Sequence, residues 1–562
     1  MSACAQFGFK LIPLAEGTEL VDVPEKTVLV QPVKPLEVVA RKPSAGPNGQ
    51  AKLNKFEQVK REKDGLDVLP DIKRYAECGD AAAITEDDAQ RMKWYGLFVR
   101  KQTPGHMMMR LRSVCGRMTA QQWRVIAGLS DIFGKGFCDL TTRQQVQMRW
   151  FSIGDVPEIW RQLHEVGLTS QQTGMDNVRG VCGCPAAGLT PNELFDATPV
   201  ARQFTDMLVG NREFTNLPRK FNVTITGCLE NCCHPETQDI GLVPAVKEEG
   251  EKGREGEEEN RASIVGFNVL VGGKQGSGGY RPADDLDVFA LPEEAAELCK
   301  QITFIFRDHG LREVRTKARL AFLIEERGVA WLREELERRW GRPLRTAGVD
   351  QRMKEHADHI GIYRQKLAGL NYVGLHVPVG RITTDQMRGV ADLAERYGNG
   401  DIRLTTGQNA IIANVPDARI GELTQEPLLR ELRYDPTPVM RGLVSCTGID
   451  YCHLALIETK GWAIDVAKRL EERLGDASAK VKPLTIHWSG CSAGCGLHQA
   501  ATIGLQGCRS RQPSGEIVDA AHVFVNGASG PDARVGLELL NDVPCEELAD
   551  AMLPLVKFLA KS

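Results

Sequence analysis

The chain has 562 residues, of which 42% are hydrophobic and 26% are charged, and its formal net charge is −4. A chain of this length folds into several domains rather than around one core. The negative balance argues against a general affinity for nucleic acid, and no apolar run reaches the roughly 18 residues of a membrane-spanning helix. We therefore expect a multidomain protein that binds any anionic ligand through local arginines and lysines.

The N-terminal segment, residues 1–55, is rich in proline and shows little hydrophobic periodicity, which predicts an extended arm. Its first 22 residues carry acidic side chains and lack the basic stretch and apolar core of a secretory signal, which favours a cytoplasmic location. Further along, a helix is expected at Glu86–Lys93. The almost wholly charged stretch 247–260 is expected to be a solvated loop.

An internal repeat is the most informative feature of the chain. A shift of 264 residues places 116–144 on 380–408 with thirteen of 29 positions identical and no gap. Each copy predicts a helix that begins with a capping box, Thr119 with Gln122 and Thr383 with Gln386, and each then enters a strand through Leu-Thr-Thr. The similarity resumes downstream, so residues 106–245 and 370–510 are predicted to be two copies of one α+β unit, related by a pseudo-two-fold axis with a shared cleft.

The second copy holds two pairs of cysteines, Cys446-x5-Cys452 and Cys491-x3-Cys495. In a reducing compartment such pairs indicate metal binding rather than disulfides. A [4Fe–4S] cluster requires one thiolate for each iron, and the glycines beside these cysteines allow backbone amides to approach the sulfurs. The alternatives are a structural zinc site, for which the x5 spacing is wide, and four inert buried thiols.

The first copy repeats this pattern only in part. Cys184, Cys228 and Cys232 match three of the four ligands, but Thr190 stands where Cys452 would be. Cys182 and Cys233 lie nearby and could complete a set. We expect these thiols to serve only in packing.

A cationic face distinguishes the first copy from the second. Odd positions of the strand after the first helix carry Arg143, Gln145, Gln147 and Arg149, whereas the second copy has Gly407, Asn409, Ile411 and Ala413. In the preceding strand, Arg110 and Arg112 share a face, and Gly374 is the counterpart of Arg110. Arg179, Lys220 and Asn222 follow in two later loops. Either strand alone could be a solvated edge, but the joint loss in the second copy favours an anion-binding face in the first.

These residues resemble the sirohaem-dependent nitrite and sulfite reductase family. The resemblance spans residues 55–550, and the motifs that carry it are MMMRLR (107–112), LTTRQQVQ (140–147), DNVRG (176–180), NLPRKFN (216–222), SCTGIDYC (445–452) and SGCSAGCGLHQ (489–499). It implies the α+β, internally duplicated fold of that family with a cofactor cleft between domains. The divisions it implies are the arm 1–55, a first ferredoxin-like half-domain region 56–180, a first cluster-type domain 181–345, a second half-domain region 346–440 and a cluster-binding domain 441–562.

The resemblance also implies two cofactors, sirohaem and one [4Fe–4S] cluster. Cys446, Cys452, Cys491 and Cys495 would hold the cluster, and Cys495 would also bind the sirohaem iron. The carboxylates of sirohaem would be bound by side chains of the first copy: Arg112, Thr141, Arg143, Gln147 and Arg149. Substrate and protons would be handled by Arg110, Arg179, Lys220 and Asn222.

The substrate implied is nitrite. Sulfite reductases of this family carry two lysines in the fourth motif, whereas this chain has Lys220 and Asn222, and the single charge of nitrite needs fewer cations than sulfite. Six electrons are needed to reach ammonia. The glycine-rich stretch 272–279 does not spell a dinucleotide motif and is read as a turn or a disordered tip, so a built-in NADPH domain is not expected. The resemblance implies reduced ferredoxin as the electron donor, and we expect a monomeric enzyme. The alternatives are a sulfite reductase, an iron–sulfur precorrin synthase and a non-enzymatic electron carrier or sensor.

Overall fold

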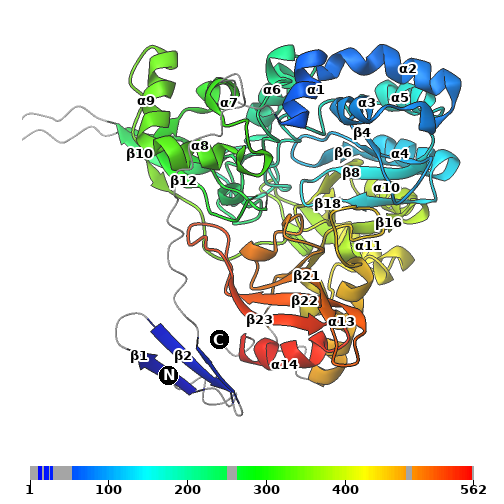
Figure 1. Cartoon of the computed structure of the whole chain (residues 1–562), viewed down its shortest axis with the longest axis vertical. Helices are drawn as coiled ribbons and strands as arrows, with labels where there is room; N and C mark the ends of the chain where they lie inside the picture. The colour runs from blue at the N-terminus through cyan, green and yellow to red at the C-terminus, as the bar shows by residue number, and fades with distance from the viewer. Residues whose placement is uncertain are drawn as a thin grey trace, which may run out of the picture.

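The computed structural model describes residues 10–14, 18–23, 26–29, 54–249, 262–276, 278–475, 482 and 484–559. Its body has three lobes (Figure 1). The two ferredoxin-like halves lie side by side and form one lobe, and each of the two cluster-type domains forms another. The charged stretch expected to be a loop lies mostly outside the described residues, although its first residues extend a strand. In the N-terminal segment the described residues form one antiparallel sheet: β1 (Lys10–Leu14), β2 (Thr18–Val23) and β3 (Lys26–Leu29).

The two halves exchange a strand. β6 of the first copy pairs with β17 of the second, and β16 of the second copy pairs with β7 of the first. Each five-stranded sheet is therefore completed by the other copy. The first has the order β16 (Arg381–Thr383), β7 (Phe137–Leu140), β8 (Val146–Phe151), β5 (Met107–Arg110) and β4 (Leu97–Val99); the second has β14 (Gly361–Arg364), β15 (Leu370–Leu375), β18 (Ala410–Pro416), β17 (Asp401–Leu404) and β6 (Arg117–Thr119).

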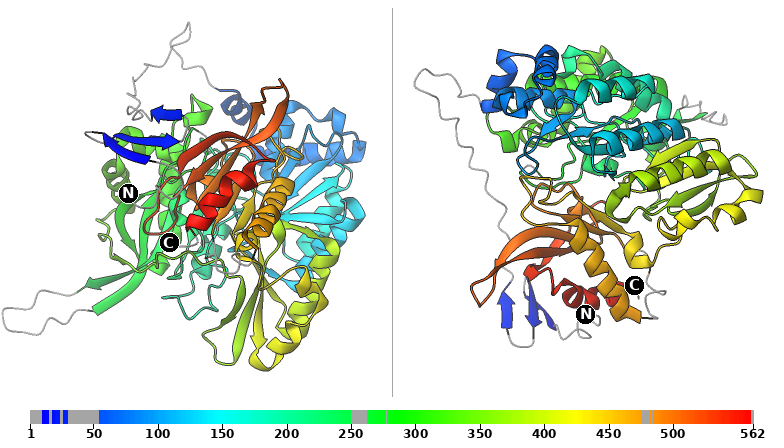
Figure 2. Two further views of the ribbon diagram at one scale, coloured as in Figure 1. Left: turned by 90° about the horizontal axis from the view of Figure 1, so that it is seen from below. Right: turned by 90° about the vertical axis from the view of Figure 1, so that its right-hand side faces the viewer.

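The repeated helices pack against each other at the pseudo-two-fold axis. Both predicted capping boxes are present, at the N-termini of α4 (Ala120–Phe133) and α10 (Thr384–Tyr397). Their apolar faces, with Trp123 and Met387 fully buried, belong to one core that extends through both sheets. Figure 2 shows the two helices side by side. The remaining helices of this lobe are α1 (Lys55–Glu62), α2 (Leu69–Cys78), α3 (Glu86–Arg91), α5 (Val156–Glu165) and α11 (Ile420–Leu423).

Each cluster-type domain has a mixed sheet whose short parallel strands lead into the site. In the first, β9 (Val223–Ile225) runs parallel to β10 (Ile240–Glu249). β10 then pairs antiparallel with β11 (Ala262–Val271) on one side and with β13 (Val349–Asp350) on the other, and β12 (Asp284–Ala290) pairs antiparallel with β11. Its core is closed by α7 (Pro292–His309), which begins with proline and two glutamates and ends with a histidine, as the helix dipole favours. The other helices are α6 (Thr198–Leu208), α8 (Leu320–Arg327) and α9 (Val329–Trp340).

The second cluster-type domain repeats this plan with its own core. Its strands are β19 (Leu443–Ser445), β20 (Ile486–Ser489), β21 (Ile503–Arg511), β22 (Ile517–Val525) and β23 (Leu537–Pro544), and its helices are α12 (Pro438–Arg441), α13 (Lys460–Leu474) and α14 (Leu548–Leu559). The first three strands are parallel, and the loops that follow β19 and β20 carry the cysteine pairs. Among the described helices of the whole chain, none has the length and apolar character needed to cross a membrane.

Candidate active site

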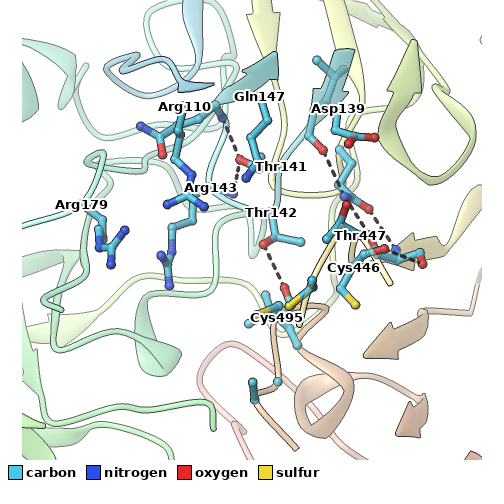
Figure 3. A pocket seen from close by; sticks show the side chains of 18 of the residues that line it. Arg110, Asp139, Thr141, Thr142, Arg143, Gln147, Arg179, Cys446, Thr447 and Cys495 are labelled. Atoms are coloured by element: carbon cyan, nitrogen blue, oxygen red, sulfur yellow. Dashed lines mark hydrogen bonds between the residues drawn. The ribbon is translucent and has the colours of Figure 1, made fainter. Parts of the chain in front are cut away.

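A cavity of about 280 Å³ lies where the first half-domain meets the two cysteine loops of the second cluster-type domain. Its walls come from β5 and β8, from the loops around Arg179 and Lys220, and from the segments that carry Cys446, Cys452 and Cys495. Figure 3 shows arginines on one side and sulfurs on the other. Nearly all of the predicted site residues therefore converge on one place, although they are spread over more than 380 positions of the chain.

Two glutamines of the repeat fix the shape of this junction. Gln144 and Gln408 occupy the left-handed region, with φ of 55° and 66°. The Gln408 amide donates to Leu140 O and Ser445 O and accepts from Ser445 N, and Gln144 makes the equivalent three bonds with Leu404 and Gly183. Each glutamine thus joins the other copy's Leu-Thr-Thr turn to a cluster-type domain.

The cavity is strongly cationic. Asp139 is the one carboxylate among its described lining residues, and it is already paired with Arg149, Arg381 and Lys460. Burial raises the pKa of Asp139, but these cations outweigh burial and hold that pKa below its ordinary value. The cationic lining residues are Arg100, Arg110, Arg143, Arg149, Arg179, Lys220 and Lys460.

Burial and mutual repulsion act on these cations. Burial and the nearby Arg143 and Arg100 lower the pKa of Arg110 to about 9. Burial and neighbouring arginines also lower the pKa of Arg179 and of Lys220 well below their ordinary values. Such a concentration of like charge is unfavourable until an anionic ligand compensates it, so the cavity is suited to a ligand with several negative charges.

Unpaired polar atoms point to the same ligand. Among the residues that the structure describes, Asn222 Oδ1, Arg179 Nε, Gln145 Nε2 and Gln275 Oε1 are buried without a hydrogen-bond partner, and all four residues line the cavity. The backbone of Asn222 is fixed because its N–H donates to Asp239, which forms a buried ion pair with Arg319. Buried polar atoms normally have partners, so a polar ligand fits this site. Carboxylates, of which sirohaem has eight, would accept from Arg179 Nε and Gln145 Nε2, whereas the oxygens of Asn222 and Gln275 need a donor.

Two predicted cofactor contacts have other partners. Arg112 does not line the cavity; its guanidinium donates to the carbonyls of Gln171, Gln172, Val178 and Arg179, and so holds the loop that carries Arg179. Arg149 does line it, but it bonds Asp139, Gln147 Oε1 and Thr447 Oγ1 and lies over the ring of Tyr451. Arg149 therefore ties β8 to the first cysteine loop.

The cysteine loops face the cavity. Cys446, Cys452 and Cys495 line it, and Cys495 is the exposed one of the four, whereas Cys491 lies outside the lining. The amide of Gly490 donates to Cys446 Sγ at 3.1 Å, as the glycine-rich sequence predicted, and Thr142 Oγ1 donates to Cys495 O at 3.2 Å. Three thiols at one opening, with Cys491 close enough to interact with all three and an amide aimed at one sulfur, fit a [4Fe–4S] cluster.

Several lining residues had not been singled out from the sequence. Arg100 and Lys460 lie outside the six motifs that carry the family resemblance, and only their charge could have marked them. The glycine-rich stretch read as a turn packs on the second cysteine loop: a Cβ at Gly276 would lie 2.1 Å from Ala493 O, and Tyr280 Oη donates to Ser492 O at 2.8 Å. Its glycines serve close backbone approach, which spacing alone does not reveal.

Comparison with known proteins gives a consistent result. The model of the nitrite and sulphite reductase 4Fe-4S domain matches residues 174–344, and that of the nitrite/sulfite reductase ferredoxin-like half domain matches 99–166 and 363–429. The ferredoxin–nitrite reductase of Synechococcus elongatus is 42% identical over 90% of this chain and 96% of its own length. The chloroplastic ferredoxin–nitrite reductase of Zea mays is 40% identical over 90% and 89%.

A solved structure has the same fold over most of its length. The Mycobacterium tuberculosis NirA protein has a TM-score of 0.83 and 31% identity over 93% of this chain and 96% of its own. The fold and the site thus define an iron–sulfur oxidoreductase with a duplicated architecture and a cationic cavity. The chain belongs to the nitrite and sulphite reductase family.

Proposed function

We propose that this enzyme reduces nitrite to ammonia with six electrons from reduced ferredoxin, which pass through a [4Fe–4S] cluster to sirohaem. The observation that carries the proposal is the cationic cavity directly beside Cys446, Cys452 and Cys495. Relatives that match over most of the chain are named ferredoxin–nitrite reductases, including an assimilatory one from Haloferax mediterranei at 38% identity over 90% of this chain and 89% of its own. These names favour nitrite over sulfite.

Two sets of residues would hold the cofactors. The cluster would be bound by Cys446, Cys452, Cys491 and Cys495, and Cys495 is the proposed shared ligand of the sirohaem iron because it is exposed to the cavity. When bound, the coupled pair supplies the electrons and the site on which the substrate is reduced. The sirohaem carboxylates would be bound by residues on the polar face of β8 and the turn before it: Thr141, Arg143 and Gln147, with Arg100 added from the structure.

The substrate side would be formed by Arg110, Arg179 and Lys220. Arg110 Nη1 and Arg179 Nη1 both donate to Thr173 O, at 3.0 and 2.6 Å, so one carbonyl fixes two guanidinium groups. Their fixed charges would bind the nitrite oxygens without reorganisation. Lys220 Nζ, whose pKa is lowered by burial and then by Arg143 and Arg319, is the proposed proton donor, because a depressed ammonium pKa makes proton release easier near neutral pH.

The electron donor would dock over the first cysteine loop. Leu454 and Leu456 are 57% and 45% exposed there. Lys101 contributes positive charge next to His453, and Lys135 lies over Trp150, whose ring contacts Tyr451. An apolar centre with a basic rim suits a small acidic ferredoxin. A cytoplasmic, monomeric enzyme remains our prediction.

The visible spectrum of the purified protein tests the cofactors. We expect the Soret and alpha bands of sirohaem on broad iron–sulfur absorption, together with acid-labile sulfide. Comparison of kcat/KM for nitrite and sulfite with reduced ferredoxin then tests the substrate. A higher value for sulfite would reassign the enzyme, and efficient turnover with NADPH by this chain alone would contradict the donor.

A further inference from the structure

A second group of thiols lies in the first cluster-type domain. Cys184, Cys228 and Cys232 are 2%, 1% and 3% exposed, and their sulfurs all lie within 4.8 Å of one another. They occupy the positions that correspond by the internal repeat to Cys446, Cys491 and Cys495. The catalytic proposal uses none of them.

The spacing of these sulfurs suits one metal ion rather than an iron–sulfur cluster. Around a tetrahedral zinc with Zn–S bonds of about 2.3 Å, neighbouring sulfurs lie roughly 3.8 Å apart. A cubane places each thiolate on a different iron and spreads the sulfurs further. Over the described part of the chain, no three of Cys446, Cys452, Cys491 and Cys495 come within the 4.8 Å that the first-copy thiols meet.

His359 lies beside the thiols as the candidate fourth ligand. Its ligand nitrogen is within 4.8 Å of Cys184 Sγ and of a Glu230 oxygen but not of all three sulfurs, so the ring would have to shift toward the other two sulfurs when the ion binds. His359 Nε2 lies 3.8 Å from Cys184 Sγ, close to the sulfur–nitrogen separation around one tetrahedral ion. Its Nδ1 lies 3.0 Å from Tyr372 Oη, and the histidine is 2% exposed. A partner on the far nitrogen that orients the ring is the usual companion of a metal-binding histidine. His359 also has a left-handed backbone, with φ of 58°, which is strained for a histidine.

The surroundings accommodate a thiolate at Cys228. The amide of Glu230 donates to Cys228 Sγ at 3.4 Å. The Cys228 thiol donates to Asn192 O at 3.2 Å, and this bond is lost when a metal replaces the thiol proton. Asn192 O also accepts from Leu229 N at 2.9 Å, so the carbonyl still has a hydrogen-bond partner. Hydrogen bonds to sulfur stabilise the charged form.

Apolar packing covers this position where the other copy has its cavity. The thiols pack with Ile411 and Ala413 of β18, which correspond to Gln147 and Arg149 of β8, and with Tyr372 of β15. The three thiols are therefore enclosed on this side, and Glu230 Oε2, 3.5 Å from Cys228 Sγ and 3.9 Å from His359 Nε2, is the polar neighbour of the group. Such enclosure suits a structural site without an open coordination position.

We infer that Cys184, Cys228, Cys232 and His359 bind one structural zinc ion. Three sulfurs and one imidazole in a closed site are a common structural zinc set. The ion would join the first cluster-type domain, which supplies the cysteines, to the segment before β14, which supplies the histidine. These thiols would then have a role beyond the packing that we expected from the sequence.

Zinc analysis of the cofactor-loaded protein, expressed with added zinc and desalted without chelator, tests the inference. We expect about one zinc per chain by mass spectrometry, and X-ray absorption at the zinc edge that fits three sulfurs near 2.3 Å and one nitrogen near 2.0–2.1 Å. Tyr372→Phe removes only the hydroxyl partner of His359 and should weaken zinc retention against a chelator about 10- to 100-fold.

Variants assign the ligands. Cys232→Ala and His359→Ala should lose zinc, whereas Glu230→Gln and the equally buried control Cys299→Ala should keep it. Two results with the wild-type protein would overturn the inference: less than about a tenth of a zinc per chain, or zinc bound by nitrogen and oxygen atoms only. Both are measured on the wild-type protein, so they do not depend on whether a cysteine variant folds. Retention in His359→Ala with loss in Glu230→Gln would remove His359 from the site.

Discussion

Asn222 lies at the point where charge can select the substrate. It is 5% exposed, its Oδ1 has no hydrogen-bond partner in the described part of the chain, and it lines the cavity with Lys220. Asn222→Lys adds a second buried cation on that wall, which favours a dianion over a monoanion. We expect the ratio of kcat/KM for sulfite to that for nitrite to rise by about tenfold, equivalent to about 1.4 kcal/mol. Asn222→Asp is the opposite control, and an unchanged ratio in both variants would remove this residue from substrate selection.

The charge of Arg110 should make ligand binding depend on pH. Its pKa is about 9 because of burial and then of neighbouring arginines, and an anion in the cavity stabilises the charged form and raises that pKa. Affinity is therefore greatest below pH 9 and falls as the pH rises through 9. For the apoprotein and uroporphyrin III, an octacarboxylate probe, fluorescence titration should give binding up to about fourfold weaker at pH 9.5 than at pH 7.5. In Arg110→Gln this dependence should be smaller, and an equal dependence would exclude Arg110 as its source.

Single residues also show how far sequence patterns can predict a site. Alternation along β8 placed Gln147 and Arg149 on one face, and both line the cavity together with Arg143 from the turn before β8. Alternation also placed Arg112 beside Arg110, but β5 ends at Arg110 and Arg112 turns into the backbone of a loop. A strand pattern gives the face of a side chain only while the strand lasts. Depth and competing partners depend on tertiary packing.

At the scale of elements, the two glutamine clamps should contribute equally to stability. Gln408→Ala breaks three hydrogen bonds and leaves buried backbone groups without partners, which should lower the free energy of unfolding by about 3 kcal/mol in chemical denaturation. Gln144→Ala breaks the equivalent three and should cost a similar amount. Gln425→Ala, at an exposed position, should change little. A large difference between the two variants in the free energy of unfolding would show that the two glutamines, although equivalent in geometry, do not contribute equally to stability.

The helices and turns of the repeat were predictable because their signals are local. Capping boxes and the Leu-Thr-Thr turns each depend on neighbouring residues, and both copies carry them. The exchanged strands β6 and β16 were not predicted. They have three residues each, and their partners lie more than 240 positions away, so no periodicity reveals them.

At the scale of the molecule, donor recognition must overcome a net charge of −4. Local lysines near the first cysteine loop would supply the attraction, so activity with reduced ferredoxin should fall steeply as ionic strength rises. At low ionic strength, Lys135→Glu should raise the KM for ferredoxin by about fivefold with little change in kcat, and salt should narrow the difference. Lys73→Glu, at an exposed position of α2, makes the same charge change away from the first cysteine loop and should leave the KM for ferredoxin nearly unchanged. Equal effects of both variants would show that only net charge matters.

The strand exchange also constrains how the chain is synthesised. The first half-domain needs β16, which begins at Arg381, to cover the edge of β7, so its sheet stays incomplete until two-thirds of the protein has left the ribosome. An unpaired edge during that interval is a place where nascent chains can associate wrongly. Chains that stop before Arg381 should therefore be prone to aggregation rather than yield a stable half-enzyme. Assembly of the cofactor cavity becomes a late event, because its walls exist only once both copies have been made.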